Sequence, residues 1–552
     1  MEHKRLMGVR AVLKKKKHWV FGGIIVLQLF CIVYFANAKQ GFFVDELWSY
    51  GLANSYYHPH VYYNDALEKQ WVSGTYFKEY LEVSPEERFC YDSVIFNQKN
   101  DFHPPLFYLV LHTICSVFPN SFSKWYGIVP NIFYFIGISV LLYKLSRKIL
   151  GETWLALLPS AIYGFSTGAI SSVVYIRMYE LMTMWMVFSA ILHLELLERK
   201  CITIKNLAPI LMISYLGYMT QYYFFIFTFF LALYCCIYLA MTKRGKALIG
   251  YCTTMYLSLC IVAFTFPTAF EKLFGEGRGG EAVKNLFELK TFLANVKSFY
   301  IILGQDLLAD CQTLFIAAAM LSMLGIFVKK YIKINWKTDA NQNGSEVITL
   351  TIRGFEKKLM VDGGAAGCII VTLTMASYFF VIAKIAPYRM ERYIFGIYPF
   401  AILGLICWGH WILKKYRVPL KYHFGIVLLV FSVVTIKGYY ENRVHYIYPE
   451  NKTALEISKH FEGRDCFYIT WDYYKLAGNA LELQNAERVY TMIPDNLEQL
   501  PGMIDFSKED FIVYVDEGFD QEEILDQVKK YSGYKNCEKL FVSRCIAYKF
   551  FK

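Results

Sequence analysis

Long apolar runs separated by short polar and basic stretches dominate the first 440 residues of the chain. A helix needs about 20 apolar residues to cross the hydrocarbon core of a bilayer. Eleven apolar segments of 15 to 22 residues predict membrane-spanning helices: 19–38, 125–143, 153–173, 180–197, 206–220, 224–241, 247–267, 307–328, 363–384, 393–413 and 422–439. The first segment is too long for the apolar part of a signal peptide, so we expect it to remain as a helix.

Lysines and arginines gather at alternate ends of these segments. The basic clusters lie within 4–17, 144–148, 199–205, 243–246, 329–337 and 414–421. Short cytoplasmic loops of membrane proteins are rich in Lys and Arg, so we assign all six clusters to the inner side. This predicts a cytoplasmic N-terminus and, after an odd number of crossings, an extracytoplasmic C-terminus of a multi-pass protein, with the plasma membrane as the expected location.

One further apolar run, residues 104–118, is shorter and begins with two prolines. Counting it as a span would move the cluster at 144–148 to the outer side and invert every later loop. We therefore predict an interfacial or re-entrant helix within a long first outer loop, residues 39–124. The longest inner loop, 329–360, is polar and predicts a flexible linker.

The sequence predicts three parts: a basic cytoplasmic N-terminus (1–18), a membrane domain (19–440) and a C-terminal extracytoplasmic domain (441–552). In the last part, β-rich runs at 465–471, 488–493, 510–516 and 545–551 alternate with helical periodicity at 453–461, 474–483 and 522–531. This alternation indicates a small α/β domain. Its three cysteines (Cys466, Cys537 and Cys545) allow either one disulfide or free thiols. No Gly-rich phosphate loop follows its strands, so no catalysis is assigned to it.

Composition agrees with a membrane protein and excludes an ordinary soluble enzyme. Hydrophobic residues make up 56% of the 552 residues and charged residues only 19%, against about 45–50% and 25% in typical soluble domains. The net charge of +11 could suggest nucleic acid. However, the positive excess lies in the short inner clusters, whereas residues 442–552 carry 14 Lys and Arg against 19 Asp and Glu. We therefore expect no nucleic-acid partner.

Asp45 and Glu46 form a carboxylate pair directly after the first predicted span. Carboxylates beside a bilayer are expensive unless they are solvated or used in chemistry. A carboxylate can take a proton from an acceptor hydroxyl, so the pair is a candidate catalytic site. The alternative is a pair of acids that complements the dipole at a helix N-terminus.

His103, in the sequence Asp101-Phe-His103-Pro-Pro105, could orient a substrate or a carboxylate; the alternative is a bystander beside a helix start. Arg177 and Tyr179 lie in the short outer loop 173–180. Arginine at a membrane boundary either snorkels or binds phosphate through its planar fork of donors.

Two other outer loops carry arginines. Arg278 lies in a glycine-rich stretch whose backbone could approach a ligand closely, or which is simply a flexible loop. Arg389, Arg392 and Tyr393 follow the ninth predicted span and either clamp a phosphate or anchor the chain at the interface. By the charge rule all these sites face the same side, which favours a transferase with a membrane-borne phosphate donor.

At these residues the chain resembles the GT-C superfamily of membrane glycosyltransferases, and within it the family 39 group of protein O-mannosyltransferases and bacterial aminoarabinose transferases. The resemblance rests on Asp45-Glu46 after the first helix, His103-Pro-Pro105, Arg177-x-Tyr179, and Arg392-Tyr393 before a late helix ending in Pro399. It covers residues 1–440.

The resemblance implies a GT-C-like helical membrane fold and transfer of a sugar from a polyprenyl-phosphate donor to an outer acceptor, usually with inversion. Asp45 would be the general base, with Glu46 orienting or assisting it. His103, Arg177, Tyr179, Arg278, Arg389, Arg392 and Tyr393 would bind the substrate and its lipid phosphate. The partners implied are the donor, membrane lipid and an acceptor that is a protein, a lipid or a cell-wall glycan.

The chain also departs from the resembled families. Its second outer loop lacks the Asp-x-Asp type metal motif of related oligosaccharyltransferases, so no metal ligands are assigned, although a divalent metal is not excluded. Gln221 stands where similar bacterial sequences would have His. Three alternatives stay open: a transporter or flippase for lipid-linked sugars, a cell-surface glycopolymer polymerase or ligase, and a structural assembly protein.

Overall fold

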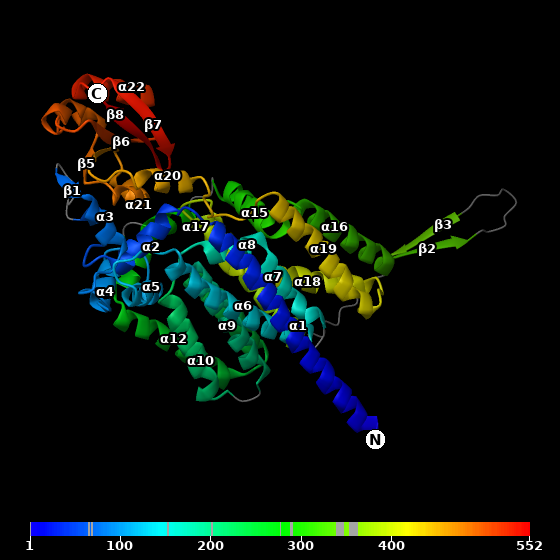
Figure 1. The fold of residues 1–552 in the computed structure, drawn as a ribbon. Coiled ribbons are helices and arrows are strands. Elements are labelled where there is room, and N and C mark those ends of the chain that lie inside the picture. Colours follow the sequence, from blue (N-terminus) through cyan, green and yellow to red (C-terminus); the bar gives the residue numbers. More distant parts are fainter. Residues whose placement is uncertain are drawn as a thin grey trace.

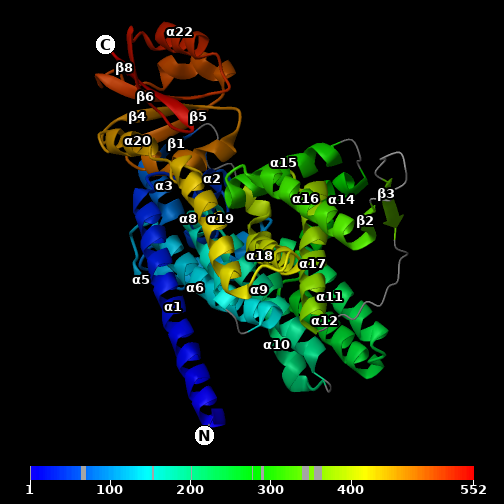
Figure 2. The same ribbon diagram turned by 90° about the vertical axis from the view of Figure 1, so that its right-hand side faces the viewer.

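The computed structural model describes residues 2–63, 67, 70–151, 154–199, 202–275, 278–287, 291–337, 347–352 and 363–552. A bundle of helices forms most of the molecule, and a mixed α/β domain sits on one end of it (Figures 1 and 2). The N-terminus lies at the opposite end from this domain (Figure 1). The structure thus has the predicted class: many apolar helices followed by a small α/β region.

Eight helices in the described part of the chain are long and apolar enough to cross a membrane. They are α1 (Glu2–Ala38, apolar from Lys16), α6 (Trp125–Leu150), α9 (Tyr179–Glu198), α11 (Tyr223–Met241), α12 (Gly245–Thr265), α17 (Gly363–Ile385), α18 (Tyr398–Lys415) and α19 (Leu420–Tyr440). Each corresponds to one predicted span.

Two bent pairs raise the number of candidate spans to ten. The first joins η2 (Trp154–Leu157) and α7 (Leu158–Phe165) to α8 (Thr167–Val174) at 56°, where Ser166 caps a new helix. The second joins α15 (Phe292–Leu308) to α16 (Gln312–Tyr331) at 94°. Here Ala309 and Asp310 have positive φ values, which end the helix. The span predicted at 307–328 therefore begins only at Gln312.

The one remaining predicted span, 206–220, is α10 (Ile204–Tyr218), a helix of 15 residues. At 1.5 Å per residue it is about 22 Å long, shorter than the roughly 30 Å hydrocarbon core. It packs beside α9 and α12. The predicted segment is also only 15 residues long, so its shortness is already visible in the sequence.

The basic clusters that precede and follow the early helices meet at one end of the bundle. Lys17 lies over the ring of Trp154, and Lys148 forms an ion pair with Glu198. Arg244 donates to the main-chain oxygen of Leu197 at 2.8 Å. Four predicted inner clusters therefore share one face, as the charge pattern requires, at the end of the bundle that holds the N-terminal part of α1 (Figure 1).

The described part of the first predicted outer loop forms four short helices and one strand. They are α2 (Val44–Asn54), β1 (Trp71–Ser73), α3 (Gly74–Leu81), α4 (Tyr91–Lys99) and α5 (Leu106–Val117). The 12-residue α5 is the short helix predicted from residues 104–118. It packs against α2, where Phe107 and Leu111 are buried. This packing fixes the position of α2.

The α/β domain contains a six-stranded sheet in the order β1-β5-β4-β6-β8-β7. The predicted strands are β4 (Asp465–Ile469), β5 (Arg488–Met492), β6 (Asp510–Asp516) and β8 (Cys545–Phe551). The first three are parallel, and β8 is antiparallel to β6. Two strands were not predicted: β7 (Asn536–Val542), whose mixed polarity hides the alternation, and β1, which comes from the first outer loop and pairs with β5.

Helical elements of this domain are α20 (Asn451–Ser458), η5 (Tyr473–Asn479), α21 (Ala480–Leu483), η6 (Pro494–Gly502) and α22 (Gln521–Ser532). The three predicted helical segments are thus present, although 474–483 is largely 3-10 helix. Cys466, Cys537 and Cys545 are free thiols. Three hydrophobic clusters stabilise the described part of the molecule: one runs from the bundle into the domain, one lies between the sheet and α22, and a small one joins α1, α6 and η2.

The remaining described elements are α13 (Thr268–Phe274), α14 (Arg278–Phe287), the 3-10 turns η3 (Glu391–Tyr393) and η4 (Phe395–Ile397), and an antiparallel hairpin of β2 (Ile332–Lys337) and β3 (Val347–Ile352). The hairpin projects from the bundle after α16 (Figure 1). It occupies part of the predicted linker at 329–360, of which 338–346 and 353–360 lie outside the described residues.

Candidate active site

The two acidic residues of the site lie in the first turn of α2. Phe43 precedes the helix in an extended conformation, and its N–H donates to the Glu46 carboxylate at 2.7 Å. Carboxylates near a helix N-terminus interact favourably with the dipole. The alternative interpretation, in which the acids complement the dipole at a helix N-terminus, therefore applies to Glu46. It does not account for the partners of Asp45.

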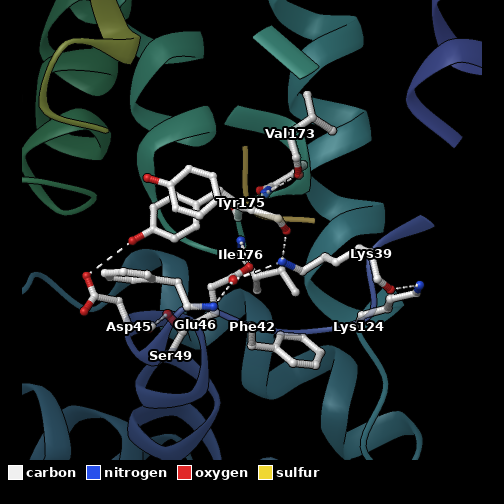
Figure 3. A network of polar contacts seen from close by, with 12 residues as sticks. Lys39, Phe42, Asp45, Glu46, Ser49, Lys124, Val173, Tyr175 and Ile176 are labelled. Atoms are coloured by element: carbon white, nitrogen blue, oxygen red, sulfur yellow. Dashed lines mark hydrogen bonds and ion pairs between the residues drawn. The ribbon is translucent and has the colours of Figure 1, made fainter. Parts of the chain in front are cut away.

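Glu46 is completely buried and forms an ion pair with Lys39 at 3.0 Å. It also accepts a hydrogen bond from the Ile176 N–H at 2.9 Å, and Lys39 donates to the main-chain oxygen of Tyr446 at 2.6 Å. Figure 3 shows Lys39, Glu46 and Ile176 converging between α1, α2 and the loop after α8. Glu46 therefore ties together three separate segments and has no oxygen facing an open space.

Asp45 points the other way from α2, toward Tyr175 (Figure 3). Its carboxylate forms a close ion pair with Arg392 and accepts from the Tyr175 hydroxyl at 3.3 Å. Arg392 also donates to the Tyr175 oxygen at 3.0 Å. Burial, followed by the charge of Asp45, raises the pKa of Tyr175 well above its ordinary value, so its hydroxyl keeps its proton. The Asp45 side chain remains 12% exposed.

Arg177 is buried beneath Asp45, and neutral groups surround its donors. One terminal nitrogen donates to the Asp45 main-chain oxygen at 3.2 Å, the Ser49 hydroxyl at 3.1 Å and the Tyr108 hydroxyl at 3.1 Å. Its Nε is buried and has no hydrogen-bond partner among the residues that the structure describes. A buried guanidinium that has no carboxylate on its own donors retains strong attraction for an anion.

The other terminal nitrogen of Arg177 lies 3.2 Å from Nε2 of His103. Guanidinium groups only donate, so Nε2 accepts and Nδ1 carries the proton. That proton points to the Asp101 carboxylate, 2.7 Å away. Burial acts to raise the pKa of Asp101, but His103 and the nearby Arg177 outweigh it and hold this pKa below its ordinary value. Asp101 and His103 thus orient Arg177.

Aromatic rings enclose the charged groups. The Arg392 guanidinium lies 5.3 Å from the ring centres of both Phe43 and Tyr393. Tyr175 stacks on Tyr446 with ring centres 4.0 Å apart, and on Tyr179 at 6.0 Å. These low-polarity walls strengthen the charge interactions inside the site.

Seven predicted site residues are therefore brought together, namely Asp45, Glu46, His103, Arg177, Tyr179, Arg392 and Tyr393. Arg389 is exposed and donates instead to the Asn295 side chain at 2.9 Å, away from this group. Arg278 begins α14, but its side chain lies outside the described part of the chain. Within the described residues, no group of three or more His, Cys, Asp or Glu is arranged to hold a metal ion.

Residues in or beside the site that were not predicted include Tyr175, Lys39, Tyr446 and Arg544. Tyr175 lies two positions before Arg177 and could have been found as part of the same polar loop. Lys39, Tyr446 and Arg544 are separated from the motifs by the fold, and no local pattern marks them. Arg544 lies against Phe43, with its guanidinium carbon 4.9 Å from the centre of the Phe43 ring.

The arrangement places one partly exposed carboxylate beside two oriented guanidinium groups, all inside an aromatic enclosure. Among the described residues, the Nε and second terminal nitrogen of Arg392 have no hydrogen-bond acceptor, so they remain available to a ligand. The geometry can therefore hold an anion next to a group that accepts a proton.

Neither a protein-family model nor a curated protein sequence matches the chain. Among solved structures, two crystal structures of ArnT from Cupriavidus metallidurans are similar to it. The structure bound to undecaprenyl phosphate has a TM-score of 0.47, and the apo structure has 0.45. Each is 9% identical in sequence, and each comparison covers 96% of this chain and 98% of the other.

Proposed function

We propose that this protein is an integral membrane glycosyltransferase that moves a sugar from a polyprenyl-phosphate carrier to an acceptor hydroxyl. The observation that carries the proposal is the grouping of Asp45, Arg392 and Arg177 from three distant segments at the end of the bundle beneath the α/β domain. The resemblance seen in the sequence motifs points to the same chemistry.

In the proposed reaction the acceptor oxygen attacks the anomeric carbon and gives its proton to the Asp45 carboxylate. The bond between that carbon and the phosphate oxygen breaks, and the phosphate leaves with the electron pair. Arg392 and Arg177 stabilise the growing negative charge of the leaving phosphate. Attack from the face opposite the phosphate inverts the anomeric configuration.

The ion pair between Asp45 and Arg392 is consistent with a site that binds the donor phosphate next to the proton acceptor. When the donor phosphate takes the free donors of Arg392, the guanidinium is shared between two anions. Its ion pair with Asp45 is then weakened, which leaves the carboxylate free to contact the acceptor hydroxyl when the donor is bound. Tyr175 donates to the same Asp45 oxygen and keeps it oriented.

An apolar cavity of about 980 Å³ supports a lipid-borne donor. It lies between α15, α16, α17 and α18, with Leu307 and Ala401 toward one end and Lys414 toward the other. Its volume is at the upper end of the usual range for ligand pockets. Leu307 follows Asp306, whose carboxylate contacts Tyr398 and His445, so the cavity approaches the segment that carries Tyr446.

The test is donor consumption by the purified full-length protein. Polyprenyl-phosphate sugars are supplied one at a time with a cell-envelope extract as acceptor, and mass spectrometry follows free polyprenyl phosphate and newly glycosylated products. Transfer of the sugar supports the proposal. A transporter would move the donor across vesicles and leave it intact, and this outcome with every donor would reject the enzyme assignment.

A further inference from the structure

The α/β domain meets the helical bundle through a defined edge of its sheet. The parallel strands β4, β5 and β6 all point their carboxyl ends the same way, and β8 begins at this edge because Cys545 pairs with Asp516. In α/β sheets, ligands bind outside the carboxyl ends of parallel strands. Here η5, which follows β4, packs directly on α2, and Tyr474 contacts Trp48 with ring centres 6.0 Å apart.

Arg544, the residue before β8, extends from this edge to the active site. Its guanidinium lies 4.9 Å from the centre of the Phe43 ring and donates to the Phe42 main-chain oxygen at 3.4 Å. Arg392 lies 5.3 Å from the same ring. The Phe43 ring, two residues before Asp45, thus contacts one guanidinium from the helical bundle and one from the α/β domain.

The contact between the two parts is close at this point. A side chain added at Gly478 in η5 would place its Cβ 3.0 Å from Cγ of Arg544 and 3.6 Å from Cγ2 of Val44. Glycine therefore lets the domain approach α2 and holds the stem of Arg544 against it. The direction of the Arg544 side chain is determined by packing, not by a charged partner.

Among the described residues, Arg544 is, like Arg177, a cation near α2 that forms no ion pair. Lys39 is paired with Glu46, and Arg392 with Asp45. The Arg544 side chain is half-buried. Glu482 is the acid that interacts electrostatically with Arg544. It is buried, and its carboxylate accepts a hydrogen bond from the Asn479 side-chain amide at 2.6 Å. A guanidinium in this state has donors to offer to an oxyanion.

We propose that Arg544 binds the phosphate of the lipid-linked donor, so that the active site is completed by the C-terminal domain. This rests on the proposed function. The ligand group recognised is a phosphate ester. Its oxygens would accept hydrogen bonds from the guanidinium of Arg544 in the α/β domain and from that of Arg392 in the helical bundle. The domain thereby couples its own docking on α2 to donor binding.

The experiment measures binding of undecaprenyl phosphate to the full-length protein in detergent. Arg544→Ala is compared with Arg544→Lys and with Lys459→Ala, which removes a positive charge from an exposed position of the same domain. Undecaprenol, which lacks the phosphate, is the second probe, and inorganic phosphate is the competitor. Hydrogen exchange of α2 and η5 reports whether the domain remains docked.

We expect Arg544→Ala to weaken undecaprenyl phosphate binding about tenfold or more, since a charge-assisted hydrogen bond is lost. Undecaprenol binding should not change, Arg544→Lys should recover part of the affinity, and Lys459→Ala should bind like the wild type. Competition by inorganic phosphate that disappears in Arg544→Ala would assign the contact to phosphate itself.

Unchanged binding by Arg544→Ala would overturn the inference, and so would an equal loss for undecaprenol. Loss of docking together with loss of binding in both Arg544 variants would also overturn it, because the residue would then be structural. If the wild type binds no undecaprenyl phosphate at all, the proposed function fails first. The two failures are therefore distinguishable.

Discussion

Asp45 and Arg392 form an ion pair although 347 residues separate them in the chain. Arg177, by contrast, donates to the main-chain oxygen of Asp45 and leaves its carboxylate alone. The two arginines therefore differ in role: Arg392 competes directly for the carboxylate, and Arg177 is held in place below it. This difference shapes the predictions for single substitutions.

Arg392→Ala should reduce sugar transfer by at least about a hundredfold, because it removes both the phosphate donors and the partner of Asp45. Arg389→Ala is the matched control, three positions away and exposed, and should retain most of the activity. Steady-state rates with a lipid-linked donor make the comparison. Equal losses in the two variants would show that the loop as a whole, and not Arg392, matters.

Lys39 and Glu46 should behave as a buried structural pair. Removing one partner, as in Lys39→Met or Glu46→Gln, leaves an uncompensated or unsatisfied buried group and should destabilise the protein by roughly 3–5 kcal/mol. The double variant should regain a large part of this loss. Thermal unfolding in detergent measures it, and additive losses in the double variant would contradict direct coupling.

The Asp101 and His103 pair predicts an acid limit for the site. The pKa of Asp101 is lowered in the folded protein, so its contribution is fully present above the unfolded value of about 3.9 and is lost as pH falls through the folded value. Asp101→Asn should reproduce at pH 7 the weakened donor binding that the wild type shows only in acid. A variant that binds normally at pH 7 would separate Asp101 from Arg177.

Glu482 predicts a second pH effect, in the α/β domain. Burial raises its pKa to about 7, although Asn479 and Ser543 oppose the shift. Because the folded value is above the unfolded one, the contribution of Glu482 to stability is greatest in acid and falls by roughly 3 kcal/mol between about pH 4.5 and pH 7. Glu482→Gln keeps an acceptor for Asn479 and should remove this slope in thermal unfolding. An unchanged slope would assign it to another group.

The helical architecture could be predicted because hydropathy and basic clusters act locally along the chain. Ten of the eleven predicted segments correspond to single or bent helices that pass the length and hydropathy test. The bends at Ser166 and Ala309 could not be seen, since a cap residue or a positive φ leaves the apolar run intact. Strand β1 was missed because its pairing with β5 joins segments more than 400 residues apart.

The site was predictable where chemistry and sequence position coincide. Asp45, Arg177 and Arg392 stand out as charged residues beside apolar runs, and the fold brings them together. Arg389 carries the same local signal as Arg392, and only the turn geometry of η3 decides which of the two faces Asp45. Lys39, Tyr446 and Arg544 depend on tertiary packing, which no motif encodes.

The most direct test of the whole account is Asp45→Asn. The change keeps the shape and the hydrogen bond from Tyr175 but removes the proton acceptor. The account predicts that sugar transfer falls by at least about a thousandfold, while undecaprenyl phosphate still binds, at least as tightly as to the wild type, because Arg392 is freed from Asp45. The protein should still fold, with some loss of thermal stability because Arg392 is left without its partner. Near-wild-type transfer by Asp45→Asn would contradict the assignment of Asp45 as the general base.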